Sequence, residues 1–214
     1  EAETGLHHPP GSKKDITMNE ETTDLSVRDL GDALIREAIA GNESAVEQLV
    51  ASGVDVDYLD ANGVTALMAA AKRGHFDVMT LLLAKGACTS PTETSTGRTA
   101  LMLACLSGNS QSVQLLQLAG ADVNVRDAHR TTPLMMAAIR GDIEMVRTLV
   151  YAGAEIGNRD ENGFTALDWA KKWRRNAVVA FLQSSGIRIW KEGGTFTGLD
   201  KDLPFIEPRM NAGG

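Results

Sequence analysis

Glycine and threonine recur in this chain at a fixed spacing, and that repeat restricts the possible folds more than any other feature. Gly41, Gly74, Gly108 and Gly141 are separated by 33, 34 and 33 residues. Further series are Gly53, Gly86, Gly120, Gly153 and Gly186, and Thr65, Thr99, Thr132 and Thr165. Such a period is typical of repeat proteins, in which small units stack on their neighbours. The single extra residue falls in the stretch 91–96, which we interpret as a loop insertion.

Each unit is predicted to form two short helices joined by turns. In the second unit, Thr65 can cap a helix of small and strong helix formers, and Gly74 can take the left-handed conformation that ends it. Residues 76–84 then carry apolar side chains at helical spacing, and residues 60–63 supply turn chemistry between units. Helices this short are not stable alone in water, so stacking of neighbouring units must complete the core.

These units resemble the ankyrin repeat. Its Thr-Pro-Leu-His-x-Ala motif is matched in part by Thr132-Pro133-Leu134-Met135-Met136-Ala137, and residues 74–87 and 121–124 follow the rest of the pattern. The motif histidine is replaced in every unit, by Met68, Met102, Met135 and Asp168. The recurring methionines are interpreted as core residues.

The resemblance covers about residues 27–190 and implies an all-α ankyrin-repeat solenoid of five helix-turn-helix repeats with short β-turn fingers. The predicted repeats are residues 27–59, 60–92, 93–126, 127–159 and 160–190. Charged residues at Arg36 and Glu37 are typical of a terminal unit with nothing stacked on it.

The two ends of the chain are predicted to be extensions of the solenoid. Residues 1–26 are expected to be a flexible N-terminal extension, and residues 191–214 an extended C-terminal segment. Trp190, Phe196 and Phe205 make the C-terminal part too aromatic for a plain solvated tail. It either folds back on the last repeat or docks on a partner, and the sequence leaves both alternatives open.

No catalytic, cofactor-binding or metal-binding pattern emerges from the motifs. The sequence lacks a phosphate-binding loop, a nucleophile elbow and a kinase signature set. His75 sits at a helix junction and is interpreted as structural, whereas His129 is expected at an exposed turn tip. The rival class is a hydrolase or transferase that uses His129 with neighbouring acids. We predict a non-enzyme with no cofactor and no small-molecule substrate.

Charge and cysteine content narrow the partners and the compartment. The net charge of −7 argues against nucleic acid as the main partner. No apolar run approaches the roughly 18–20 residues that a membrane span needs, so no membrane insertion is expected. Cys88 and Cys105 lack zinc-site spacing and are interpreted as reduced structural thiols, which favours a cytoplasmic protein, without excluding nuclear or cytoskeletal association. By itself the protein is predicted to be a monomer.

The resemblance implies that a partner protein binds at the finger tips and first-helix ends, which line a concave face. The matching positions in this sequence are Lys72, Arg73, Arg98, Leu106, Arg126, His129, Ile139, Arg140, Arg159, Phe164, Lys172 and Trp173. This set is basic although the chain is acidic, so the expected partner segment is acidic and partly apolar. A helix dipole accounts for Lys72, Arg73 and Arg140 equally well. We predict an adaptor, scaffold or assembly subunit; the alternative is the regulatory part of a larger enzyme or channel assembly.

Overall fold

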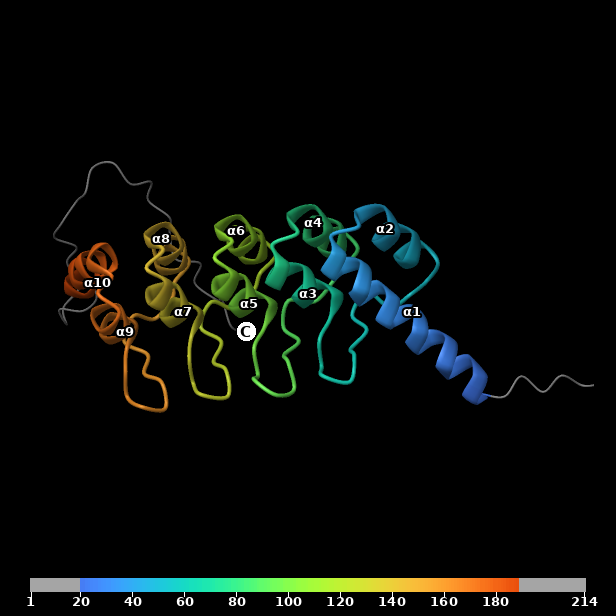
Figure 1. The fold of residues 1–214 in the computed structure, drawn as a ribbon. Coiled ribbons are helices and arrows are strands. Elements are labelled where there is room, and N and C mark those ends of the chain that lie inside the picture. The colour runs from blue at the N-terminus through green and yellow to red at the C-terminus, as the bar shows by residue number, and fades with distance from the viewer. Residues whose placement is uncertain (1–19, 189–214) are drawn as a thin grey trace, which may run out of the picture.

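This computed structural model describes residues 20–188 of the chain, with side chains from residue 28 to 185. The described residues form ten helices in consecutive pairs (Figure 1). The pairs are α1 (Glu20–Ala40) and α2 (Glu43–Ala51), α3 (Ala66–Arg73) and α4 (Phe76–Ala84), α5 (Ala100–Ser107) and α6 (Ser110–Leu118), α7 (Pro133–Arg140) and α8 (Ile143–Tyr151), and α9 (Ala166–Lys172) and α10 (Asn176–Arg188). The described residues contain no strand, which confirms the predicted all-α class.

The helices form two layers. The inner helices α1, α3, α5, α7 and α9 contact one another in chain order, and the outer helices α2, α4, α6, α8 and α10 do the same (Figure 1). Four long loops connect each outer helix to the next inner helix and extend away from the outer layer, beyond the inner helices. We call residues 57–65, 90–99, 124–132 and 157–165 of these loops the fingers. The arrangement is the stacked solenoid that the repeat predicts.

The repeating threonines and glycines mark the ends of the inner helices. Thr65, Thr99, Thr132 and Thr165 each stand at the N-cap, where the side-chain oxygen accepts a hydrogen bond from the backbone N–H three residues later. Gly74, Gly108 and Gly141 end three of these helices with φ of 77°, 79° and 80°. An L-residue with a side chain rarely adopts that backbone conformation, which explains why glycine recurs there.

Methionine takes part in the core where the ankyrin motif has histidine. Met68, Met102 and Met135 are at most 1% exposed, and Met136 and Met145 are also buried. The interpretation of these residues as core is confirmed. Flexible thioether side chains fill the space between successive inner helices. Dispersion contacts of methionine therefore replace the polar contacts that a histidine would make at these positions.

One polar side chain occupies a core position without a partner. Ser112 is the third residue of α6, and the third residues of α4, α8 and α10 are Val78, Met145 and Val178, all at most 1% exposed. Ser112 is equally buried, and its hydroxyl oxygen has no hydrogen-bond partner among the described residues.

Replacing Ser112 by alanine is therefore expected to stabilise the protein by about 1 kcal/mol, because it removes an unsatisfied buried hydroxyl and improves helix propensity. Urea unfolding of the two chains measures the difference. Ser110→Ala is the matched control, since the Ser110 hydroxyl donates to the Asp142 carboxylate at 3.2 Å and its removal should bring no gain. A Ser112→Ala chain that is less stable than the parent would contradict the expectation.

The first helix begins before the predicted start of the solenoid at residue 27. Helix α1 begins at Glu20, so residues 20–26 are helical where a flexible extension was predicted. The polar character of this stretch hid the helix, because glutamate is a good helix former as well as a solvated residue. Residues 1–19 and the predicted segment 191–214 lie outside the described residues. The boundaries of the individual repeats stay predictions.

Candidate partner-binding face

An aspartate carboxylate organises three of the four fingers. One oxygen of Asp60 accepts hydrogen bonds from the backbone N–H groups two and four residues later, both at 2.8 Å. Asp127 and Asp160 do the same within their fingers, at 2.8–2.9 Å, and both are at most 5% exposed. The remaining finger contains the predicted insertion, and there Thr96 donates to Glu93 instead. Each turn is therefore fixed by a side chain of its own sequence.

Neighbouring fingers are also joined to one another through the backbone. The N–H groups of Thr94, Ala128 and Glu161 donate to the carbonyl oxygens of Asn62, Thr96 and His129 in the preceding finger, at 2.8–3.0 Å. The tips therefore form a connected row, and a partner that binds there meets a preorganised surface.

The inner-helix ends add apolar and basic side chains to this row. The last turn of each inner helix contributes one side chain at an equivalent position. From α1 to α9 these are Ile39, Lys72, Leu106, Ile139 and Lys172. Leu106 is 38% exposed and Trp173, the residue after Lys172, is 52% exposed. We call the fingers and these helix ends together the finger face. The fingers and the inner helices lie on the same side of the solenoid, away from the outer layer (Figure 1).

Four arginines of the predicted partner-binding set are engaged within the protein. Arg98 pairs with the buried carboxylate of Asp127 in the next finger at 3.4 Å, and Arg126 donates to the Asn158 side chain. Arg140 and Arg159 donate to the carbonyl oxygens of Leu106 and Gly163, both at 2.7 Å. Each guanidinium has further donors. A first role of these arginines is nevertheless to hold repeats and turns together, which the sequence analysis missed.

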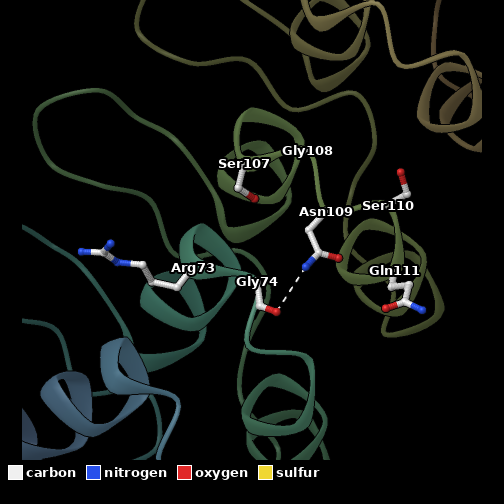
Figure 2. A pocket seen from close by; sticks show the side chains of 7 residues that line it. All are labelled: Arg73, Gly74, Ser107, Gly108, Asn109, Ser110 and Gln111. Atoms are coloured by element: carbon white, nitrogen blue, oxygen red, sulfur yellow. Dashed lines mark hydrogen bonds between the residues drawn. The ribbon is translucent and has the colours of Figure 1, made fainter.

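Lys72 and Arg73 differ from those arginines. Both are exposed, and neither makes a hydrogen bond or ion pair with any described residue. Figure 2 shows the Arg73 side chain extending away from a hollow of about 400 Å³ between the ends of α3 and α5 and the start of α6. Within that hollow, Asn109 donates to the Gly74 carbonyl oxygen at 3.2 Å. The two cations of α3 thus offer unpaired positive charge on the finger face.

An aromatic cluster forms the other end of the finger face. The rings of Phe164 and Trp169 lie 5.3 Å apart, and the Lys172 ammonium lies 5.1 and 4.6 Å from their centres. Trp169 donates its indole N–H to the second oxygen of Asp160 at 2.9 Å. Lys172 therefore stabilises the cluster instead of standing free, and Trp169 is a site residue that the sequence analysis did not include.

The histidines have contacts of two kinds. Nε2 of His75 donates to the Ile39 carbonyl oxygen at 2.9 Å, in agreement with its structural interpretation. Nδ1 of His129 lies 2.9 Å from a carboxylate oxygen of Glu161 on the next finger tip, and both side chains are about half exposed or more. Among the described residues no group of three His, Cys, Asp or Glu residues is placed to hold a metal ion.

Four ionisable groups have pKa values that their surroundings shift, and burial raises the pKa of one of them, Tyr58. Hydrogen bonds from Thr165 lower the pKa of Asp168. Together the two side chains form a capping box at the start of α9. Burial raises the pKa of the Cys105 thiol, and a hydrogen bond with Asp57 raises that of Cys88. Cys105 is buried as a structural thiol should be, whereas Cys88 is exposed. Both thiols are free and are held mainly in the protonated, less reactive form.

Comparison with known proteins agrees with the repeat pattern. A family model described as "Ankyrin repeats (3 copies)" matches residues 34–127 and 113–192. The chain is 40% identical over 93 residues, 44% of its length, to the ankyrin repeat and KH domain-containing protein mask-1 of Caenorhabditis elegans. It is 35% identical over 91 residues, 42% of its length, to the nuclear factor NF-kappa-B p105 subunit of Rattus norvegicus.

The matches cover only 4% and 9% of those two relatives, so the likeness concerns the repeats and not the whole proteins. Helices long and apolar enough to cross a membrane are absent from the described part of the chain. Because the family model covers more than half of the sequence, the chain belongs to the ankyrin-repeat family, whose repeats generally mediate protein–protein interaction.

Proposed function

We propose that this protein is a non-catalytic interaction module, an adaptor, scaffold or assembly subunit, that binds an acidic and partly apolar segment of another protein across its finger face. The observation that carries the proposal is that one connected surface presents both cations without an internal partner and exposed apolar side chains. Lys72 and Arg73 lie on the second helix pair, and Phe164 and Trp173, 36% and 52% exposed, lie at the C-terminal end of this surface. Leu106 stands between them.

The spacing of the repeats suggests how such a segment would lie. Packed helices are about 8–10 Å apart, so the three steps from α3 to α9 span roughly 24–30 Å. An extended chain rises about 3.3 Å per residue, so roughly seven to nine residues cover that distance. Carboxylates near one end of the segment would meet Lys72 and Arg73. An apolar or aromatic side chain near the other end would pack against Trp173 and Phe164.

The revised roles of the arginines sharpen this proposal. Each of these four arginines has further donors. Their first partners are nevertheless internal, so replacing Arg98, Arg126, Arg140 or Arg159 would weaken the scaffold as well as binding. Lys72 and Arg73 have no such second role among the described residues. They are the cations whose replacement reports on the partner alone.

The two free thiols also support placement in a reducing compartment such as the cytoplasm.

Peptide selection followed by charge removal tests the function. Random peptides of about twelve residues, longer than the predicted contact, are displayed on phage and selected on the full chain. We expect enrichment of Asp or Glu at one end and of apolar residues at the other. Lys72→Gln with Arg73→Gln should then weaken binding of the selected peptide tenfold or more, about 1.4 kcal/mol, and reduce its salt dependence.

The matched control removes two exposed cations of the outer layer, Lys85→Gln with Arg147→Gln. It makes the same change in net charge and should leave affinity nearly unchanged. Equal losses in both double variants would show only a long-range charge effect. No loss in the Lys72 and Arg73 variant, or selection of basic peptides, would refute the proposed partner chemistry.

A further inference from the structure

A mainly apolar hollow lies at the last helix pair. It has a volume of about 710 Å³, and Ile156, Leu167 and Leu182 line it. Leu67, Leu101 and Leu134, the residues equivalent to Leu167 in earlier inner helices, are at most 1% exposed because the next pair covers them. Leu167 is only half-buried. The hollow is thus the unfinished end of the core.

The polar substitutions around this hollow are unlike a surface prepared for another repeat. Asp168 stands where Met68, Met102 and Met135 are buried between successive pairs. A carboxylate whose pKa is lowered by Thr165 stays ionised, and covering it with another methionine-lined helix would desolvate that charge. Arg159 adds a cation to the same hollow. A covering segment must therefore combine apolar side chains with charged or polar ones.

Helix α10 also departs from the other outer helices. Those helices have nine residues and end before their repeating glycine, whereas α10 has thirteen and runs through Gly186 to Arg188. The chain does not make the turn that starts another finger at this point. It continues directly into residues 189–214, whose sequence contains Trp190, Phe196 and Phe205 as well as charged residues of both signs.

We propose that residues 189–214 fold back over this hollow and cap the solenoid, with at least one of Trp190, Phe196 and Phe205 packed against Leu167. The distance allows it. Leu182 lines the hollow and lies six residues before Arg188, about 9 Å along the helix. An extended chain covers that distance in about three residues, so Phe196 and Phe205 have ample length to return. Acids and a lysine of the segment, at 200–202, can meet the mixed charges of Arg159 and Asp168.

Single replacements in the full chain test this cap. Trp190→Ala, Phe196→Ala and Phe205→Ala are each compared with the parent by urea unfolding and by hydrogen exchange of α9 and α10. At least one should lower the folded-to-unfolded ratio tenfold or more and speed exchange in these helices. Trp173→Ala is the control, since that side chain is 52% exposed and away from the hollow. The Trp173→Ala variant should lose much less stability.

A second measurement assigns the effect to the hollow. Leu167→Ala combined with the most destabilising aromatic replacement should lower the free energy of unfolding by clearly less than the sum of the two single effects. The reason is that both replacements remove the same contact. The proposal fails if all three aromatic variants match the control, which would leave the segment free for a partner protein. It also fails if the losses are additive, or if sedimentation shows that the parent buries the segment only as a dimer.

Discussion

Asp127→Ala is expected to lower the free energy of unfolding by about 2–3 kcal/mol, because one buried side chain joins a turn, its finger and the preceding finger. One oxygen accepts from the backbone N–H groups of His129 and Thr131 at 2.9 and 2.8 Å. The other accepts from Arg98 at 3.4 Å, and the Asp127 side chain is 1% exposed. Arg98 is 31% exposed, so solvent screening reduces the contribution of the ion pair itself.

Two related variants separate these contributions. Asp127→Asn keeps an oxygen for the turn but removes the charge that pairs with Arg98, so we expect a smaller loss, about 1 kcal/mol. Asp60→Ala removes the same turn bonds from a finger in which no arginine contacts the carboxylate in the described structure. Its effect should lie below that of Asp127→Ala. Urea unfolding of the three variants gives the comparison, and equal losses for Asp127→Ala and Asp127→Asn would show that the turn bonds contribute nothing.

The three finger aspartates show what sequence can and cannot predict. Residues 60–63 predict a turn, because an aspartate bonds to backbone groups within its own loop. The second oxygens of Asp127 and Asp160 are not predictable in that way. That of Asp127 meets Arg98, 29 residues earlier, and that of Asp160 meets Trp169 on the following inner helix. Those partners depend on how one repeat is rotated onto the next, which local pattern does not encode.

The same distinction explains the outcome for the inner helices and for the arginines. Glycine at 74, 108 and 141 predicts helix ends because only a local backbone angle is needed, and the structure has the expected positive φ. Arg140 satisfies a carbonyl oxygen 34 residues away, at the end of the preceding inner helix. A charge pattern read from sequence assigned that guanidinium to a partner, since it could not reveal the nearer acceptor.

Leu106→Gln combined with Trp173→Ala is expected to weaken binding of a finger-face peptide about a hundredfold, or roughly 2.7 kcal/mol, while the fold persists. The reason is that both side chains offer apolar area on the proposed contact surface, 38% and 52% exposed. They belong to repeats that are not adjacent, so their separate losses, about tenfold each, should add. The peptide is the one selected on the full chain, and titration calorimetry measures its affinity.

Leu118→Gln with Tyr151→Ala supplies the matched control. Leu118 and Tyr151 are the last residues of α6 and α8, are 88% and 47% exposed, and belong to the outer layer (Figure 1). The two double variants thus remove the same types of exposed apolar side chain from opposite layers. If the peptide binds the finger face, affinity falls only in the Leu106 and Trp173 variant, with similar urea midpoints for both. A loss confined to the control would place the peptide on the outer helices and refute the proposed face.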